Sequence, residues 1–532
     1  MRNISWSAGL LVATVGLLQA LPAAAQSFRV QCPDSTITHP SALNNNNAEP
    51  AYVVPTTQTL NAAGYLAPTA NVNGAIKCQQ IGGGDGYSTM GDGTQTYMFS
   101  FGPLSGVVDI ANGLPGTQYP SVFNAPYTGP ALQPGDPATT GLGSFTYNGA
   151  IGQVPDMDNA GAIDGHVDPR SAMDVGVMNG NIPAPLMAID EDDEFFLTLT
   201  NVGMIMRPDL FEQHTVHFHG YPNASSFYDG VPDASVAINI GASFTYYYLA
   251  PDAGTYFWHC HITPPEHLQM GMVGQIYVRP RQNRVPAGTS LYAALMMQQT
   301  DLRTACNTAA DILCSNPLPT GGATANTATQ VAGGKYAYND GDGSTRYDVE
   351  YPLQIHGFDP NFHFVGMTFN PEGFVDMKDK YFLLNGRSYP DTVIPGPLQT
   401  QSADAVNHYS QPLPSIINIP SGQRALLRIS DLDVTEYQTL ASLGIPMQVI
   451  GYNAKLLRDQ AGNNLYYNTN SITLAGGESL DVILDSCGSR DASFGCVNAL
   501  PPGTYYLYTP NLDHLSNDAE NFGGLMTEVH II

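Results

Sequence analysis

The sequence predicts an all-β protein built from two Greek-key β-sandwich domains behind an N-terminal extension. Three observations support this fold class. The composition is rich in turn formers, with 54 glycines and 40 prolines among 532 residues, and only 12% of the residues are charged. The length allows more than one domain core. The same order of strand-like segments also occurs twice along the chain.

The internal repeat defines the two domains. In each half, an Asn-Gly pair and an Ile-Pro pair precede four segments rich in strand-forming residues. These segments are 191–201, 214–220, 240–249 and 254–261 in the first half, and 421–430, 444–453, 475–484 and 503–510 in the second half. We therefore expect two β-sandwich domains of one type.

Composition sets the expected boundaries between the parts of the chain. An asparagine run at 44–47 and a glycine-rich stretch at 82–86 indicate an N-terminal extension, and the segment 320–334 has the small residues of a linker. The expected parts are a signal peptide at 1–25, an extension at 26–95, a first domain at 96–282, a linker at 283–345 and a second domain at 346–532.

The N-terminus is typical of a secretory signal. Arg2 precedes an apolar core at residues 8–18, and the small residues at 22–25 favour cleavage there. No later segment has the uninterrupted apolar length of a membrane-spanning helix. We therefore expect a periplasmic or secreted protein without a membrane span.

The chain is strongly acidic, with 46 Asp and Glu against 19 Lys and Arg and a formal net charge of −27. This charge argues against nucleic acids and anionic membrane surfaces as partners. It favours cationic partners, such as metal ions or a basic redox protein, or it only keeps an exported protein in solution.

Two short segments carry most of the chemistry: residues 214–220 (HTVHFHG) and residues 259–272 (HCHITPPEHLQMGM). Together they hold six of the 13 histidines, one cysteine and the methionine at 272. Both begin as predicted strands, and side chains alternate between the two faces of a strand. The alternation separates an inner set, His214, Cys260, His267 and Met272, from an outer set, His217, His219, His259 and His261.

The inner set predicts a copper site. A thiolate, two imidazoles and a weak thioether are the ligands of a blue-copper electron-transfer centre. Zinc is a weaker candidate, because its sites favour tetrahedral Cys and His ligands without a thioether. A structural alternative has buried histidines satisfied by hydrogen bonds and Cys260 as a small apolar core residue.

With these motifs the chain resembles the multicopper oxidases and related cupredoxins, such as laccases, ceruloplasmin and copper nitrite reductases. The resemblance implies cupredoxin-like domains. It assigns the inner set as ligands of a type 1 copper, and the outer set as one domain's half of a type 2/type 3 trinuclear cluster. The interval from Cys260 to His267 is two residues wider than in the usual laccase motif, and this longer loop is closer to that of copper nitrite reductases.

The cysteine count fits this interpretation. Seven cysteines in an exported protein leave one unpaired. Proximity along the chain suggests the disulfides Cys306–Cys314 and Cys487–Cys496, and Cys32–Cys78 completes a third pair. Cys260 remains, and a role as copper thiolate explains its presence.

The second copy of the repeat lacks the motifs. Aligning the Gly-Thr-Tyr at 503–505 with the one at 254–256 puts residues 508–510 (Tyr-Thr-Pro) in place of His259, Cys260 and His261. Residues 447–451 are expected in place of the HTVHFHG strand, and they contain no histidine. We therefore expect no type 1 site in the second domain.

In this family a full trinuclear cluster takes eight histidines, four from each of two domains, whereas this chain shows four. Three resolutions stay open. Two copies of the first domain could pool their outer sets in a homo-oligomer. The second domain could lend His356, His363, His408 or His514. The outer set could instead bind a single type 2 copper, as in nitrite reductases, although histidine at 217 stands where their catalytic aspartate is expected.

The resemblance implies an exported copper-dependent oxidoreductase. A reducing substrate, a phenol or a metal ion, or else a redox protein, gives single electrons to the type 1 copper. They pass through Cys260 to His259 and His261, the expected catalytic residues, and dioxygen is reduced at the second centre. The alternative is a type 1 copper electron-transfer or copper-binding protein without oxidase activity, and a nitrite reductase-like function is weaker still.

Overall fold

A computed structural model describes residues 30–40, 51–52, 57–70, 72–129, 147–153, 169–220, 225–250, 252–298, 327–366, 373–401, 407–459, 461–491 and 494–532. The predicted signal peptide at 1–25 and the predicted pair Cys306–Cys314 lie outside these residues. The other two predicted disulfides, Cys32–Cys78 and Cys487–Cys496, are confirmed, and Cys260 is a free, buried thiol. Within the described part of the chain, no helix is long and apolar enough to cross a membrane.

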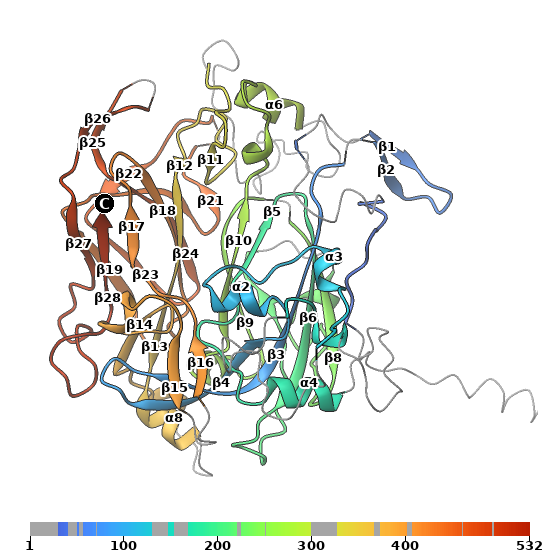
Figure 1. Ribbon diagram of the computed structural model, residues 1–532, viewed down its shortest axis with the longest axis vertical. Helices are drawn as coiled ribbons and strands as arrows, with labels where there is room; N and C mark the ends of the chain where they lie inside the picture. The colour runs from blue at the N-terminus through green and yellow to red at the C-terminus, as the bar shows by residue number, and fades with distance from the viewer. Residues whose placement is uncertain are drawn as a thin grey trace, which may run out of the picture.

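The first domain is a sandwich of two four-stranded sheets, drawn in blue to green in Figure 1. One sheet has the order β4 (Gln95–Pro103), β3 (Ile76–Thr89), β6 (Glu194–Gly203), β8 (Ser243–Leu249). The other has the order β5 (Met187–Asp190), β10 (Val273–Arg279), β9 (Gly254–His259), β7 (His217–Phe218). Apolar side chains from both sheets, such as Phe101, Leu197 and Trp258, share one buried core between them.

The second domain repeats this arrangement. One sheet runs β14 (Tyr381–Leu384), β13 (Val349–Phe358), β18 (Arg424–Asp431), β24 (Glu478–Asp485), β20 (Met447–Tyr452), β21 (Lys455–Leu456), with β22 (Tyr467–Thr469) also on β20. The other runs β17 (Ile417–Ile419), β28 (Met526–Ile531), β27 (Gly503–Tyr508), β19 (Gln438–Leu443), β23 (Ser471–Leu474). The predicted all-β fold with two β-sandwich domains is confirmed.

Short elements fill the connections. The helices are α2 (Val107–Ala111), α3 (Pro120–Phe123), α4 (Pro169–Gly176), α5 (Pro264–Gln269), α6 (Leu291–Gln298) and α8 (Pro360–Gly366). Two-stranded sheets pair β1 (Thr57–Leu60) with β2 (Leu66–Ala70), β11 (Lys335–Tyr336) with β12 (Arg346–Tyr347), β15 (Leu398–Gln401) with β16 (Asn407–Gln411), and β25 (Cys487–Arg490) with β26 (Cys496–Ala499).

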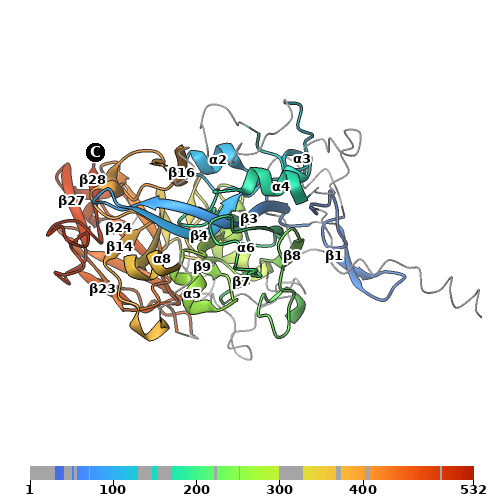
Figure 2. The same cartoon turned by 90° about the horizontal axis from the view of Figure 1, so that it is seen from below.

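The structure moves one expected boundary. Strand β3 lies within the expected extension at 26–95, yet it pairs in parallel with β6 and forms part of the first sheet. Its glycines suggested an extension outside the domain, but they permit close packing within it: a Cβ at Gly83 would lie 2.8 Å from the His214 ring. The hairpin of β3 and β4 also reaches the second domain, where β3 contacts β15 and β16 (Figure 2).

The end of the expected linker likewise packs as part of the second domain. Ala337 and Tyr338 are buried against Leu426 and Ile483 of its first sheet. The Tyr338 hydroxyl donates a hydrogen bond to Asp481.

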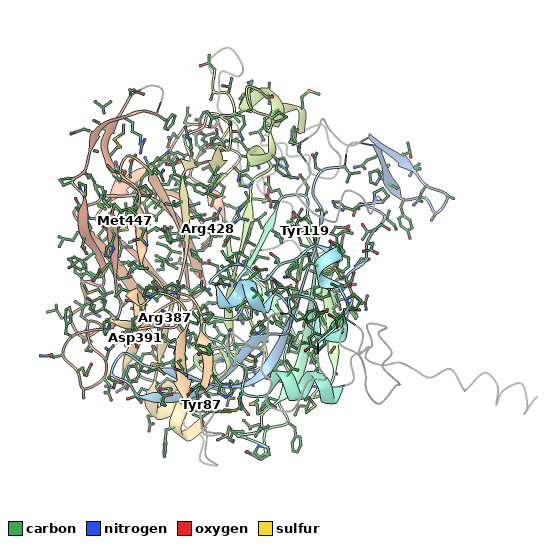
Figure 3. All side chains as sticks on the ribbon, viewed as in Figure 1. Tyr87, Tyr119, Arg387, Asp391, Arg428 and Met447 are labelled. Carbon is green, nitrogen blue, oxygen red and sulfur yellow. A yellow bond between two sulfur atoms is a disulfide. The ribbon has the colours of Figure 1, made fainter. Side chains whose placement is uncertain are left out.

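The two domains meet through the outer face of β9 and β10. The Thr255 hydroxyl donates to Asp481 at 2.6 Å, and the Gln275 amide donates to the Arg428 carbonyl at 3.0 Å. Arg428, labelled in Figure 3, is fully buried and pairs with Glu350 at 2.7 Å. Because β9 ends at His259, this interface leads directly to the candidate metal ligands.

Candidate metal centre

The inner set gathers around the connection between β9 and β10. Cys260 follows the last residue of β9, and β10 returns so that Val273 lies opposite His259. The extra residues in this connection form α5, which begins at Pro264 and carries His267. Proline at the first helical positions suits a helix start, because no backbone hydrogen bond is lost there.

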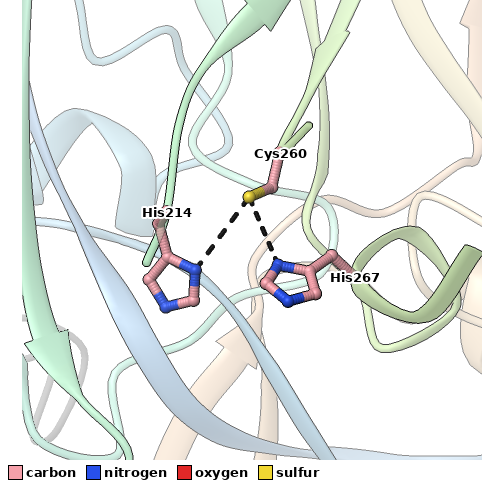
Figure 4. A group of neighbouring side chains, drawn as sticks. All are labelled: His214, Cys260 and His267. Atoms are coloured by element: carbon pink, nitrogen blue, oxygen red, sulfur yellow. Dashed lines mark hydrogen bonds between the residues drawn. The ribbon is translucent and has the colours of Figure 1, made fainter. Parts of the chain in front are cut away.

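His214, Cys260 and His267 lie together and fully buried (Figure 4). Nδ1 of His267 lies 3.2 Å from the Cys260 sulfur, and Nδ1 of His214 lies 4.0 Å from it. One donor atom from each residue falls within 4.8 Å of the others. The backbone N–H of Thr215 also donates to the sulfur at 3.4 Å. Three members of the predicted inner set therefore lie together in the structure.

Met272, the fourth member, borders the same space. It is fully buried, and its methyl carbon lies 3.4 Å from the position that a Cβ on Gly83 would take, next to the His214 ring. Its backbone is tied to the other ligands, since the Cys260 N–H donates to Met272 O at 3.2 Å and the Met272 N–H donates to His267 O at 2.9 Å.

The electrostatics of the inner set favour a thiolate. Burial raises the pKa of the Cys260 thiol, but His267 and His214 together outweigh it and hold that pKa well below its usual value. Burial lowers the pKa of His267, yet Cys260 and Glu212 raise it to about 9. The thiolate is the form that binds metals. A soft thiolate with two imidazoles and a nearby thioether is a donor set that fits copper.

The outer set gathers on the other side of Cys260. His217 and His259 lie opposite each other on β7 and β9. The ring centroids of His217, His219, His259 and His261 lie between 4.8 and 5.6 Å from their neighbours. Nε2 of His219 lies 2.7 Å from Nε2 of His259. The four outer histidines therefore lie next to one another, as the alternation of side chains along the strands predicts.

Hydrogen bonds orient two of these rings. Nδ1 of His217 donates to the Asp229 carbonyl at 2.6 Å, and Nδ1 of His259 donates to the Cys260 carbonyl at 2.7 Å. Each ring thereby presents Nε2 to the cluster, as a metal ligand does. Burial lowers the pKa of His259 to about 3 and that of His219 to about 4, so both stay neutral, as metal binding requires.

A cavity of about 200 Å³ adjoins the outer set. His219, Gly220 and Tyr256 line it from the first domain, and Asn453 and Ser479 line it from the second. One member of the outer set, His219, therefore borders a space between the domains.

The scattered histidines of the second domain have other contacts. Nε2 of His356 and Nε2 of His363 lie 3.5 and 3.0 Å from the Gln269 carbonyl. His514 stacks on Phe382, with centroids 3.8 Å apart. His408 lies on β16, opposite Thr400.

The register of the second domain corrects one alignment. There β19 pairs with β27, with Ala441 opposite Tyr508, as His217 lies opposite His259. Strand β19, and not residues 447–451 of β20, is therefore the counterpart of the HTVHFHG strand. Strand β20 belongs to the other sheet, next to β24, which the sequence alone does not show.

The same register identifies the residues that replace the inner set. Gln438, Thr509, His514 and Leu525 stand at the positions of His214, Cys260, His267 and Met272. The backbone hydrogen bonds recur: the Thr509 N–H donates to Leu525 O at 2.9 Å, and the Leu525 N–H donates to His514 O at 3.0 Å. Nδ1 of His514 lies 3.0 Å from the Gln438 side-chain oxygen. This pocket keeps one imidazole and lacks the other donors of a blue-copper site.

Two carboxylates near the sites were not predicted. A Glu212 oxygen lies 3.8 Å from Nε2 of His267, and an Asp229 oxygen lies 3.5 Å from Nδ1 of His217. Glu212 stands two residues before His214, so alternation could have indicated it. Asp229 lies in a loop after the 3₁₀ turn at Ser226–Tyr228, and no sequence pattern links it to His217.

Part of the chain is similar in sequence to known multicopper oxidases and related proteins. Residues 162–283 match the family described as multicopper oxidase. A laccase of Aspergillus fumigatus, abr2, is 34% identical over 109 residues, which cover 20% of this chain and 17% of that protein. A copper-containing nitrite reductase of Rhizobium meliloti is 35% identical over 109 residues, covering 20% of this chain and 26% of that protein.

A solved multicopper oxidase, mgLAC, gives a TM-score of 0.47 at 15% identity, with 86% of each chain covered. The chain spans less than a fifth of the length of the first curated relatives that it matches, at 17 to 19%. All eight residues of the inner and outer sets fall inside the family match. Residues 162–283 of this chain are thus similar to the multicopper oxidase family.

Proposed function

We propose that this protein is a copper-dependent oxidase that takes single electrons at the inner set and uses them at the outer set to reduce dioxygen. One observation carries the proposal: Cys260 joins the inner set, while His259 and His261 on either side of it join the outer set. Copper, when bound, supplies the one-electron chemistry.

The chain supplies a short route between the two sets. The Cys260 side chain and its two adjoining peptide units lead to the rings of His259 and His261 without a gap. The hydrogen bond from His259 Nδ1 to the Cys260 carbonyl, at 2.7 Å, adds a second connection. Burial of Cys260 and His259 keeps water away from this route.

Electrons enter, in this proposal, beside His267. Its Nε2 edge lies behind Glu212, whose side chain is 26% exposed. A carboxylate at this position suits a phenol, whose proton it can accept, or a cationic metal ion. A small reducing substrate of either class therefore fits the site, and a redox protein is the alternative donor.

A second copy of the chain completes the outer set in this proposal. Among the described residues, only the inner set brings three possible donor atoms from His, Cys, Asp or Glu within 4.8 Å of one another. As a group, the donor atoms of the outer set are farther apart than those of the inner set, so a metal there needs donors from another part of the molecule or from a second copy. The positions of the second domain equivalent to the outer set are Ala441, Leu443, Tyr508 and Pro510, and they offer no imidazole. A homo-oligomer in which two outer sets face each other supplies the missing donors.

Copper content and oxygen uptake test the proposal together. The full-length chain is loaded with copper, and copper per chain, electron paramagnetic resonance, oxygen uptake with a phenol or ferrous ion, and mass in solution are measured. We expect blue absorption, more than one copper per chain, a type 2 signal, oxygen uptake and an oligomer. One blue copper per chain, without a type 2 signal or oxygen uptake, would support an electron carrier instead.

A further inference from the structure

The second domain holds the loop that carries two of the inner ligands. Gln269 lies in this loop between His267 and Met272, and its side chain is fully buried. Its amide N–H donates to Asp379 Oδ1 at 2.9 Å, and its side-chain oxygen accepts from the Asp359 N–H at 3.0 Å. Both partners belong to the second domain, so one glutamine connects the ligand loop to that domain through two hydrogen bonds.

The neighbours of Gln269 reinforce the connection. Its backbone carbonyl lies 3.0 Å from Nε2 of His363, at the end of α8. Next to it, Leu268 is buried in a cluster with Phe358, Leu383 and Leu432 of the second domain. This turn therefore contacts the second domain through the Leu268 side chain as well as through Gln269.

The partners of Gln269 are themselves fixed. The Thr435 hydroxyl donates to the other oxygen of Asp379 and, at 3.1 Å, to Asp433. The Asp359 carboxylate accepts from the Lys378 backbone N–H at 2.7 Å. Both partners of Gln269 are therefore held by further hydrogen bonds within the second domain.

Helix α5 needs this support. It spans only Pro264–Gln269, and a helix of six residues has little stability of its own. Its N-cap, Thr263, makes no side-chain capping bond and has a φ of 37°. The positions of His267 and Met272 therefore depend on what α5 packs against.

We propose that Gln269 is a positioning residue through which the second domain, itself without a blue-copper ligand set, fixes the geometry of the inner set of the first. This inference rests on the proposed copper site. Changes to groups that orient metal ligands cost about 10- to 100-fold in metal affinity. We therefore expect Gln269→Ala to weaken copper binding by about tenfold or more and to alter the blue-copper spectrum.

The chain offers a matched control. Gln275 on β10 is also fully buried and also donates to the second domain, to Arg428 O at 3.0 Å and Ser430 Oγ at 2.9 Å. It lies outside the loop from Cys260 to Met272. Gln275→Ala should lower stability to a similar extent and leave the copper spectrum and affinity unchanged.

The experiment compares the two variants in the full-length chain. Copper affinity, visible absorption and paramagnetic resonance are measured on the loaded protein, and hydrogen exchange of residues 264–272 is measured on the copper-free protein. We expect faster exchange and an altered spectrum in Gln269→Ala alone. If both variants lose only stability, with the same spectrum and the same exchange in the loop, the inference is wrong.

A double substitution separates loss of this contact from a general loss of stability. Gln269→Glu combined with Asp379→Asn swaps the donor and acceptor of this contact and should restore the wild-type spectrum that Gln269→Glu alone alters. Failure of that rescue also contradicts the inference. If the wild-type chain binds no copper, the proposed function fails, whereas the exchange measurement still tests the role of Gln269.

Discussion

Glu350 is the residue whose replacement tests how the two domains are held together. Its carboxylate accepts from Arg428 Nε at 2.7 Å and from Arg279 at 3.1 Å, and the side chain is 12% exposed. Burial raises the pKa of Glu350, but Arg428 and Arg279 outweigh it and lower the pKa from 4.5 to about 2. Arg279 comes from the first domain, so this carboxylate joins both domains.

The pKa shift sets the size and the pH dependence of the effect. This lowering of the Glu350 pKa corresponds to about 3 kcal/mol of folding free energy at neutral pH. Removing one partner of a buried ion pair costs about 3 to 5 kcal/mol of stability, and the value from the Glu350 pKa agrees with the lower end of this range. Because the folded-state pKa is depressed, this contribution is complete above about pH 4.5 and is lost as the pH falls towards about 2.

Urea unfolding of the wild type and of Glu350→Gln at pH 7 and pH 3 measures the effect. We expect the variant to be less stable by about 3 kcal/mol at pH 7 and by only about 1 kcal/mol at pH 3. Glu528→Gln, at a pair with His530 nearer the surface, is the control and should change stability by less than about 1 kcal/mol. A difference that is the same at both pH values would refute the reasoning.

Three further predictions concern the candidate sites. Cys260→Ser should abolish the blue colour and turnover while the domain stays folded by circular dichroism; retained colour would show that the thiolate is not a ligand. Replacing His259 and His261 together with alanine should spare the blue absorption and stop oxygen uptake, and continued uptake would make the outer set structural. Glu212→Gln, beside His267, should lower kcat/KM for a phenol by about tenfold, the loss of roughly one charge-assisted hydrogen bond; an unchanged kcat/KM would move electron entry elsewhere.

Sequence reasoning was most reliable where strand periodicity and ligand chemistry agree. The strict alternation around Cys260 predicted that His259 and His261 face away from it, and their rings stack at 5.6 Å on the other side. Periodicity needs only the local backbone, so it survives without knowledge of the tertiary fold. The metal assignment itself stays a prediction until copper is measured.

Sequence reasoning failed where the role of a residue depends on a neighbour that is distant in the sequence. The glycine-rich stretch 82–86 was assigned to an N-terminal extension, because the sequence does not show that a Cβ at Gly83 would meet the His214 ring. Residues 447–451 were taken for the counterpart of the HTVHFHG strand, because choosing between β19 and β20 requires the sheet order. His356 and His363 were considered as ligands, whereas their contact with the Gln269 carbonyl depends on how the domains pack.

The pocket of Gln438, Thr509, His514 and Leu525 shows that the backbone of this loop forms without the ligands. The Thr509 and Leu525 N–H groups make the same hydrogen bonds as those of Cys260 and Met272. The two sandwiches therefore share a backbone plan and differ in what they hold: the first carries the candidate ligands, and the second packs against the loop that carries two of them.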